Sequence, residues 1–324
     1  MTLKPAALKS GDVVGVYSPS SGIEPEIMDN YKRGYKYLQD WEIKIIEAPN
    51  TFEWQGHYSA LGDIKALDFH YLLNHHDVKA IIPSVGGGSA IHMLPYLNFT
   101  LIKDKKKMIF GFSDNSIPAA VITSKTGLVT FHGHSDICFG FGDLATQEKR
   151  DKFIKKGNYT EKQIRHALFG KIKPGPIEKA SQWSIIRGGY ATGPLLGGTI
   201  NALVYLLGTG YDLAWTGTIF YWEAAFTQIH LLDQILAQFR LNGVFDRING
   251  MVIGKPDNVS EDFFQAKFDS FEKVVKRHTS PYDFPVLMNA DIGHDMECCM
   301  LPNGIRAEIV NDEIILLESP YEKD

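Results

Sequence analysis

The stretch Lys107–Val121, KMIFGFSDNSIPAAV, decides the fold because it joins an apolar strand to a helix through a tight turn. Residues Lys107–Phe112 are rich in the apolar and aromatic side chains that are typical of a buried strand. Pro118 falls in the first turn of the expected helix Ser116–Lys125, and Gly127 stands just past its end, which are the favoured places for these residues. A strand that passes directly into a helix is the repeating unit of a parallel α/β sheet.

The same unit repeats through residues 1–145. Helical spacing of apolar residues predicts helices at Glu26–Gln39 and Ser59–Leu73. Strand-like runs rich in Val, Ile or Phe are Asp12–Tyr17, Glu42–Glu47, Val78–Val85, Lys107–Phe112 and Leu128–Phe131. Five strands alternating with helices predict an α/β N-terminal domain, a doubly wound and mostly parallel sheet of the Rossmann or flavodoxin-like kind.

A basic block interrupts this alternation. Glu148–Lys179 contains ten Lys and Arg against four Asp and Glu, a net charge of +6, whereas the whole chain has −5. Together with a Pro-Gly-Pro step, this composition predicts a linker over residues 146–182 that carries one short helix. The negative charge of the whole chain argues against binding to a nucleic-acid polymer.

A second pattern of strands and helices occupies residues 183–324. Its helix-like parts are Thr199–Leu207, Ile229–Leu241 and Glu261–Arg277. Its strand-like runs are Thr218–Trp222, Gly250–Ile253, Pro285–Asn289, and a closing pair, Ala307–Val310 and Glu313–Glu318, joined at Asn311-Asp312. Mixed strands with a terminal hairpin predict a smaller, β-rich C-terminal domain of α+β or small-barrel type.

The composition is that of an ordinary globular protein, with 44% hydrophobic and 22% charged residues in a chain of 324. Three cysteines, Cys138, Cys298 and Cys299, are too few for a disulfide framework and lack the spacing of a structural zinc site. The N-terminus lacks the apolar core of a signal peptide, and no run of about 18 apolar residues predicts a membrane span. We therefore expect a cytoplasmic protein that does not associate with membranes.

Ser113 lies in the turn between the strand and the helix quoted above. Such an elbow exposes a hydroxyl at the carboxyl edge of a sheet, and the N–H groups at the start of the helix can stabilise an oxyanion. The GxSxG pattern of α/β-hydrolases would require Gly where this chain has Asn115. The alternative is that Ser113, Asp114 and Asn115 only cap the helix.

Val85–Ala90, VGGGSA, is a glycine loop that follows a strand. Its backbone N–H groups could approach a phosphate or the oxyanion of a tetrahedral intermediate. The loop lacks both the Lys of a P-loop and the spacing of GxGxxG, so a plain flexible turn is an equal alternative.

Glu223 and His294 each follow an apolar strand. A carboxylate at the end of a buried strand needs a partner, and an imidazole N–H is a natural one, although both residues could equally be surface or packing groups. Because ligands bind beyond the carboxyl ends of strands in open α/β sheets, Ser113, Glu223 and His294 could meet at one site. They would supply a nucleophile, its base and an orienting carboxylate.

Two other functions remain open from the residues alone. His132 and His134 with Asp136 offer metal-ligating atoms, although no further ligand at a suitable spacing supports a metal hydrolase. A non-catalytic two-domain protein that binds a small anion at the glycine loop would also fit.

Many segments, in order, resemble one known group, the serine peptidases that include the LD-carboxypeptidases of murein recycling and the microcin C self-immunity peptidases. The segments are GDVVGVYSPSS, VKAIIPSVGGGSAIHMLPYLNF, MIFGFSDNS, TGLVTFHGH, GPLLGGTINALVYLLGT, TIFYWEA, GVFDRINGMVIGKP and PVLMNADIGHDMECCMLPNGIRAEI. The resemblance implies a metal-free and cofactor-free Ser-Glu-His triad, with Ser113 as nucleophile, His294 as general base and Glu223 as its orienter.

The same resemblance implies an oxyanion hole made by the N–H of Asp114 and one N–H of the glycine loop, Gly87 or Gly88. It also implies a homodimer. The implied substrate is a small peptide, such as a murein tetrapeptide ending in D-Ala, or an aminoacyl nucleotide. The basic linker and Trp183 look closer to the microcin-immunity branch, where Trp183 would stack on a base, or would serve as a packing anchor.

The chain departs from the resembled pattern at two places. Ser116 stands where the family usually has Thr, which keeps the hydroxyl. After Glu223 the family often continues with acidic residues, whereas Ala224, Ala225 and Phe226 follow here. The second departure would alter the rim of the substrate site rather than the triad.

Overall fold

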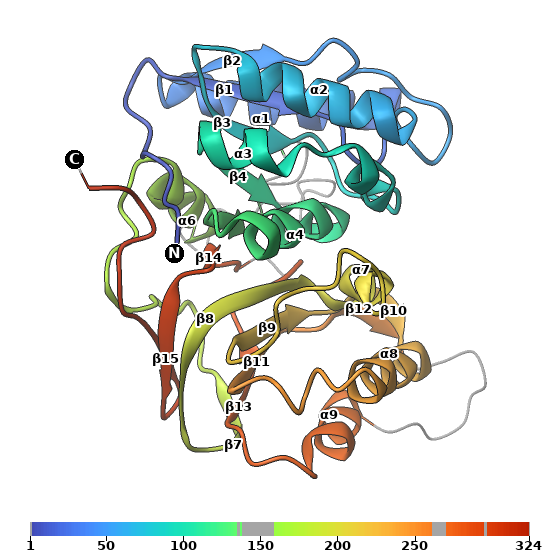
Figure 1. Cartoon of the computed structure of the whole chain (residues 1–324), viewed down its shortest axis with the longest axis vertical. Coiled ribbons are helices and arrows are strands. Elements are labelled where there is room, and N and C mark those ends of the chain that lie inside the picture. The colour runs from blue at the N-terminus through green and yellow to red at the C-terminus, as the bar shows by residue number, and fades with distance from the viewer. Residues whose placement is uncertain (1, 135–136, 138–158, 261–269, 295–296, 324) are drawn as a thin grey trace.

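Two sheets dominate the computed structural model, which describes residues 2–134, 137, 159–260, 270–294 and 297–323 (Figure 1). The first sheet has six strands in the order β14-β5-β4-β3-β1-β2. Its strands are β1 (Val13–Tyr17), β2 (Lys44–Glu47), β3 (Val78–Pro83), β4 (Met108–Gly111), β5 (Thr130–His132) and β14 (Leu301–Asn303). All neighbours are parallel except β14 and β5, so the predicted mostly parallel α/β sheet is confirmed.

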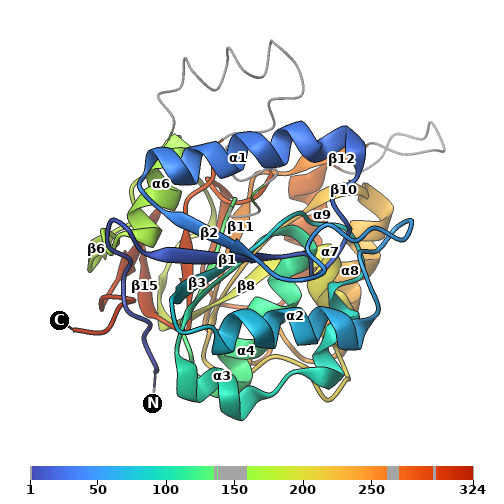
Figure 2. The same ribbon diagram turned by 90° about the horizontal axis from the view of Figure 1, so that it is seen from above.

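Helices cover both faces of this sheet, as a doubly wound fold requires. Figure 2 shows α1 on one side of β1 and β3, with α2, α3 and α4 on the other side. Their bounds are α1 (Met28–Asp40), α2 (Gly62–Asn74), α3 (Phe99–Lys105) and α4 (Ser116–Thr126). The expected end of α4 is confirmed, because Gly127 takes the left-handed conformation, with φ 74°, and donates its N–H to Thr123.

The second sheet has eight strands in the order β6-β16-β15-β8-β9-β11-β13-β7. The bounds are β6 (Gly175–Pro176), β7 (Ser184–Arg187), β8 (Tyr190–Thr199), β9 (Ile219–Glu223), β11 (Gly250–Gly254), β13 (Val286–Ala290), β15 (Arg306–Val310) and β16 (Glu313–Leu316). The centre, β8 to β13, is parallel and antiparallel strands flank it. It is thus an open mixed sheet and not the small barrel that we considered.

Smaller elements complete the second part of the chain. A two-stranded parallel pair joins β10 (Ala225–Gln228) to β12 (Asp257–Ser260). The helices are α6 (Tyr159–Leu168), α7 (Ile200–Leu203), α8 (Ile229–Leu241) and α9 (Phe271–Thr279), with short 3₁₀ turns at Pro25–Ile27, Ala90–Tyr96, Ser113–Asn115 and Val204–Leu206. Helix α6 is the short helix expected within the basic block.

Three details differ from the prediction. The segment Tyr190–Thr199 forms a strand of 10 residues that was not expected, because its glycines resemble a loop. As a consequence the helix predicted at Thr199–Leu207 shortens to α7 and one 3₁₀ turn. The first part of the predicted helix Glu261–Arg277, residues 261–269, lies outside the described residues, and α9 begins at Phe271.

Helix α4 lies between the two sheets and joins their cores. Its residues are almost all buried, since one side faces the first sheet and the other faces β8 and α7 (Figure 1). Ile117 and Val121 of α4 belong to the same apolar cluster as Leu196 and Leu203. The first sheet also takes β14 from the far end of the chain, so both parts pack as one continuous body.

Among the described residues, no helix is both long enough and apolar enough to cross a membrane.

The contact between α4 and β8 gives a stability prediction. Gly198 has φ 154°, and a Cβ there would lie 2.5 Å from Cβ of Ser116. We expect Gly198→Ala to lower the free energy of unfolding by about 1–3 kcal/mol, because neither backbone can yield easily. Thermal unfolding followed by circular dichroism measures this. Gly210→Ala, where a Cβ meets no atom within 4 Å, is the matched control; equal melting of the two variants would contradict the prediction.

Candidate active site

Ser113 follows the carboxyl end of β4 and begins the turn that leads into α4. It is half-buried and has φ 53°, in the left-handed region that side chains other than glycine rarely adopt. Such strain costs about 1–3 kcal/mol and collects at functional sites. The hydroxyl of Ser116 donates a hydrogen bond to the carbonyl of Ser113 and so stabilises the turn. The predicted strand-to-helix elbow is therefore present, with its serine in a strained conformation.

Asp114 ties this turn to the glycine loop. Its Oδ2 accepts hydrogen bonds from the N–H of Ala90 at 2.7 Å and from the hydroxyl of Ser20 at 2.5 Å. Lys65, which is buried, donates from Nζ to the carbonyl and hydroxyl of Ser89 in the same loop. Burial lowers the pKa of Lys65 to about 8, although the nearby Asp114 charge opposes this. These bonds fix the loop beside Ser113.

The two candidate glycines of the loop differ in their surroundings. Gly87 has φ 145°, and a Cβ there would lie 2.2 Å from Oγ of Ser21, so this position requires glycine for its backbone shape. Gly88 has no heavy atom within 4 Å of where a Cβ would be. Gly88 therefore borders open space, whereas Gly87 packs against Ser20 and Ser21.

Glu223 and His294 form a hydrogen-bonded pair. Glu223 ends β9 and has no exposed surface, and its Oε2 lies 3.0 Å from Nδ1 of His294. An ionised carboxylate only accepts hydrogen bonds, so Nδ1 of His294 carries the hydrogen and donates it. The other ring nitrogen, Nε2, is then left as the basic atom.

The charges of this pair support each other. Burial acts to raise the pKa of Glu223, but the positive charge of His294 and hydrogen bonds from His294 and Thr199 outweigh it and hold that pKa below its ordinary value. Burial acts to lower the pKa of His294, but Glu223 outweighs it, with a further contribution from Asp257, so the pKa of His294 is raised. A base of raised strength therefore faces the site.

Thr199 and Ser116 connect this pair to the Ser113 turn. Thr199 stands opposite Glu223 in the parallel pairing of β8 and β9, and its hydroxyl donates to Oε1 of Glu223 at 2.5 Å. The N–H of Thr199 donates to Oγ of Ser116 at 3.1 Å, and Ser116 in turn contacts the carbonyl of Ser113. One chain of hydrogen bonds thus runs from His294 to the Ser113 turn.

Aromatic rings surround His294. The ring of Phe112, the residue before Ser113, lies 4.4 Å from the His294 ring, and the ring of Phe226 meets it edge-on at 5.4 Å. Ser113 and His294 share no hydrogen bond in the ranges that the structure describes. Catalytic hydrogen bonds are often formed only when substrate is bound.

Trp183 is a buried residue, with 3% of its surface exposed. Its Nε1 donates to Oδ2 of the fully buried Asp291 at 3.0 Å, and Nζ of Lys179 lies 5.0 Å from the ring centre. This environment favours the packing anchor over the stacking surface, the two alternatives that the sequence left open. Asp291 also accepts from Ser181 and Lys255, so it fixes the end of the basic block against the second sheet.

His132 and His134 occupy different environments from those of a shared metal site. His132 is fully buried between the rings of Phe112 and Tyr221, and burial lowers its pKa to about 4. The Nε2 of His134 lies 2.7 Å from the carbonyl oxygen of Gly293. Asp136, the third residue of that hypothesis, lies outside the described residues.

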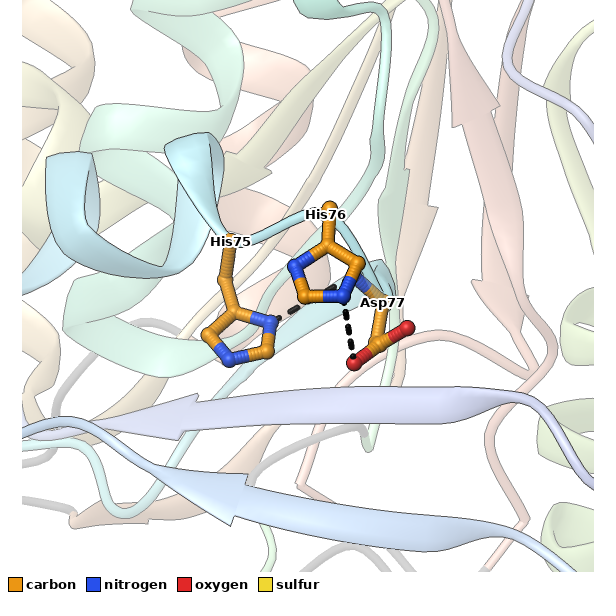
Figure 3. Close-up of side chains that lie close together, drawn as sticks. All are labelled: His75, His76 and Asp77. Atoms are coloured by element: carbon orange, nitrogen blue, oxygen red, sulfur yellow. Dashed lines mark hydrogen bonds and ion pairs between the residues drawn. The ribbon is translucent and has the colours of Figure 1, made fainter.

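Among the described residues, one group of three potential metal ligands occurs, at His75, His76 and Asp77. Figure 3 shows the two imidazole rings side by side, with the Asp77 carboxylate directed at His76. The group precedes β3, at the amino edge of the sheet, whereas Ser113 follows the carboxyl end of the neighbouring β4. It is therefore remote from the candidate active site.

Four residues of the site's framework were not found from the sequence as functional candidates: Ser20, Lys65, Thr199 and Asp257. Ser20 and Thr199 stand in two of the segments that carry the resemblance, but no local pattern marks a role for any of the four, because their partners lie far away along the chain. Thr199 had one usable signal, since it ends the segment GPLLGGT that forms the strand beside Glu223.

Comparison with known proteins identifies the family of the chain. Residues 14–133 match the LD-carboxypeptidase N-terminal domain, and residues 192–309 match the LD-carboxypeptidase C-terminal domain. The chain is 26% identical over 320 residues to the microcin C7 self-immunity protein MccF of Escherichia coli, covering 94% of this chain and 92% of that protein. It is also 26% identical over 310 residues to the "probable murein peptide carboxypeptidase" of Bacillus subtilis, covering 95% and 91%.

A solved structure of MccF in complex with glutamyl sulfamoyl guanosine has the same fold. The TM-score is 0.85 at 22% sequence identity, and the alignment covers 99% of this chain and 100% of that one. With both matched domains present in order and the relatives aligned over nearly their full length, the chain belongs to the LD-carboxypeptidase family of serine peptidases.

Proposed function

We propose that this protein hydrolyses a peptide or amide bond in a small substrate through an acyl-enzyme on Ser113. His294 would be the general base and Glu223 its orienting carboxylate. The substrate would be a murein tetrapeptide with a terminal D-Ala, or an aminoacyl nucleotide of the microcin type. Relatives named for each of these activities align with the chain at similar identity.

One observation carries the proposal: the hydrogen-bonded Glu223–His294 pair lies beside the strained Ser113 turn, linked to it through Thr199 and Ser116. A serine hydroxyl is a weak nucleophile until a base removes its proton. A buried carboxylate on Nδ1 leaves Nε2 free to do so and stabilises the imidazolium that forms.

The reaction would proceed in two halves. His294 Nε2 takes the Ser113 proton while Oγ bonds to the scissile carbonyl carbon, and the resulting oxyanion accepts hydrogen bonds from the N–H of Asp114 and of Gly87 or Gly88. His294 then gives the proton to the leaving amine as the C–N bond breaks. A water molecule, deprotonated by His294, then attacks the acyl carbon. The bond between that carbon and Oγ of Ser113 breaks, and His294 returns the proton to Oγ, which releases the acid and restores Ser113.

This assignment divides the catalytic groups between two domains, for which we propose residues 1–145 and 183–324, joined by the basic linker 146–182. Ser113 and the glycine loop come from the first, and Glu223 and His294 from the second. On the family resemblance alone, we further propose that the protein acts in the cytoplasm as a homodimer without a metal or cofactor.

The nucleophile and the base can be tested by substitution. We expect Ser113→Ala and His294→Ala each to lower kcat by about 10⁴–10⁶-fold, because removing one member of a triad disables the unit. Ser113→Ala should still bind substrate, as measured by calorimetry, since it loses only the hydroxyl. Near-normal turnover by Ser113→Ala would overturn the mechanism.

The substrate can be identified by parallel incubations. A murein tetrapeptide ending in D-Ala and amide-linked analogues of aminoacyl adenylates are incubated with wild type and Ser113→Ala, and products are followed by mass spectrometry. Release of D-Ala alone supports the carboxypeptidase, and release of the amino acid from the nucleotide supports the immunity type. Binding of both without turnover would favour the non-catalytic alternative.

The raised pKa of His294 predicts the pH dependence. A general base must be neutral, so kcat/KM should rise with pH through a midpoint above the ordinary His value of about 6.5. Glu223→Gln removes the charge that raises this pKa and leaves burial, which lowers it, so the midpoint should move to lower pH.

Nuclear magnetic resonance titration of the His294 ring measures this shift directly, without depending on activity. His70 is the control: burial lowers its pKa, and Glu223 is not among the causes, so its midpoint should stay the same in Glu223→Gln. An unchanged His294 midpoint in that variant would show that Glu223 does not act on it.

A further inference from the structure

Phe226 is an exposed aromatic residue beside the candidate base. It lies in β10, one residue after the buried Ala225, and 70% of its surface is exposed. Its ring meets the His294 ring edge-on, with 5.4 Å between the ring centres. A large apolar side chain with this exposure contributes little to the stability of the fold.

The backbone of Phe226 is also strained. Its φ is 52°, in the left-handed region, which costs about 1–3 kcal/mol for a side chain other than glycine. Ser113 is the other residue of the site with this conformation. The strain opposes folding and the exposed ring contributes little to it, so packing within the protein does not account for the position of this ring.

The residues on either side of Phe226 are nevertheless held in place by their neighbours. In the pairing of β10 with β12, Ala225 lies opposite Asp257 and Thr227 opposite Val259. Ala225 and Thr227 are buried, and Nδ2 of Asn201 donates to the carbonyl of Ala225 at 3.3 Å. Phe226 is thus held between two fixed neighbours and projects outward, in the manner of a preorganised contact surface.

We propose that Phe226 is a specificity-determining residue that forms an apolar wall of the substrate site. It would pack on an aromatic or large aliphatic side chain of the substrate residue next to the scissile bond. The inference rests on the proposed function, because it takes His294 as the group that reaches the scissile bond. The three residues that follow Glu223 in this chain, Ala224, Ala225 and Phe226, carry no charge.

A nucleobase is the other flat apolar group that could use this ring. The position of the ring favours an amino-acid side chain, because Phe226 touches His294 itself. The substrate group nearest to His294 is the one attached to the bond that is cleaved. In an aminoacyl nucleotide, the phosphate and the ribose separate the nucleobase from that bond. The test therefore varies the amino acid and the nucleobase separately.

The experiment uses the full chain and amide-linked aminoacyl adenylate analogues carrying Phe, Leu, Ala, Asp or Glu, with a second series in which guanine replaces adenine. For each, kcat/KM is measured with wild type, Phe226→Ala and the conservative variant Phe226→Leu. Leu241→Ala is the control, since Leu241 is 83% exposed at the end of α8. Binding to each variant in the Ser113→Ala background is measured by calorimetry.

We expect wild type to prefer Phe and Leu over Ala, Asp and Glu. In Phe226→Ala the ratio of kcat/KM for the Phe analogue to that for the Ala analogue should fall by about 10–100-fold, the range of a lost apolar pocket contact. Phe226→Leu should restore part of this ratio, and Leu241→Ala should leave it as in wild type.

An unchanged ratio in Phe226→Ala overturns the inference, while Ser113-dependent turnover leaves the proposed function in place. A variant effect that follows the nucleobase series and not the amino-acid series also overturns it, in favour of base stacking. If no analogue or murein tetrapeptide is cleaved or bound, both the inference and the proposed function fail.

Discussion

The buried carboxylate of Glu223 is the constraint on which the rest of the site depends. A carboxylate with no exposed surface costs several kcal/mol unless donors surround it. Its two donors, the ring of His294 and the hydroxyl of Thr199, come from segments that are distant along the chain. The charge is therefore satisfied only when β8, β9 and the loop after β13 are all in place, and this requirement fixes the direction of the imidazole.

The same requirement extends to the turn that carries Ser113. Thr199 donates one hydrogen bond from its hydroxyl to Glu223 and another from its N–H to Ser116, so one residue at the end of β8 contacts both halves of the site. Gly198 lets β8 approach α4 closely enough for this, and α4 carries the Ser113 turn at its start. A small shift between the two sheets would break a buried hydrogen bond, which costs about 1–3 kcal/mol. Polar contacts, as well as the shared apolar core, thus fix the position of one sheet relative to the other.

Local sequence patterns were sufficient for the parts of this arrangement that depend on neighbouring residues. The five parallel strands of the first sheet and the elbow at Ser113 follow from apolar runs. The rule that ligands lie beyond strand ends allowed Glu223 and His294 to meet but left other roles open for both, and only the family resemblance paired them. Patterns failed where long-range pairing decides the structure: β8 is rich in glycine, and β14 contains Pro302, yet both are strands because neighbours supply their hydrogen bonds. The partners of Thr199 lie 83 and 24 residues away, so no local period could reveal them.

The two strained residues of the site, Ser113 and Phe226, have different relations to the fold. The strain at Ser113 belongs to the strand-to-helix elbow that joins β4 to α4. The strain at Phe226 is not required by the sheet, since the pairing of β10 with β12 passes through Ala225 and Thr227 on either side of it. A conformation that the fold does not demand persists only if the surrounding structure holds it, and here both neighbours are buried. The elbow therefore positions Ser113 for the chemistry that we propose, and the rim at Phe226 is the place that would select the group accepted.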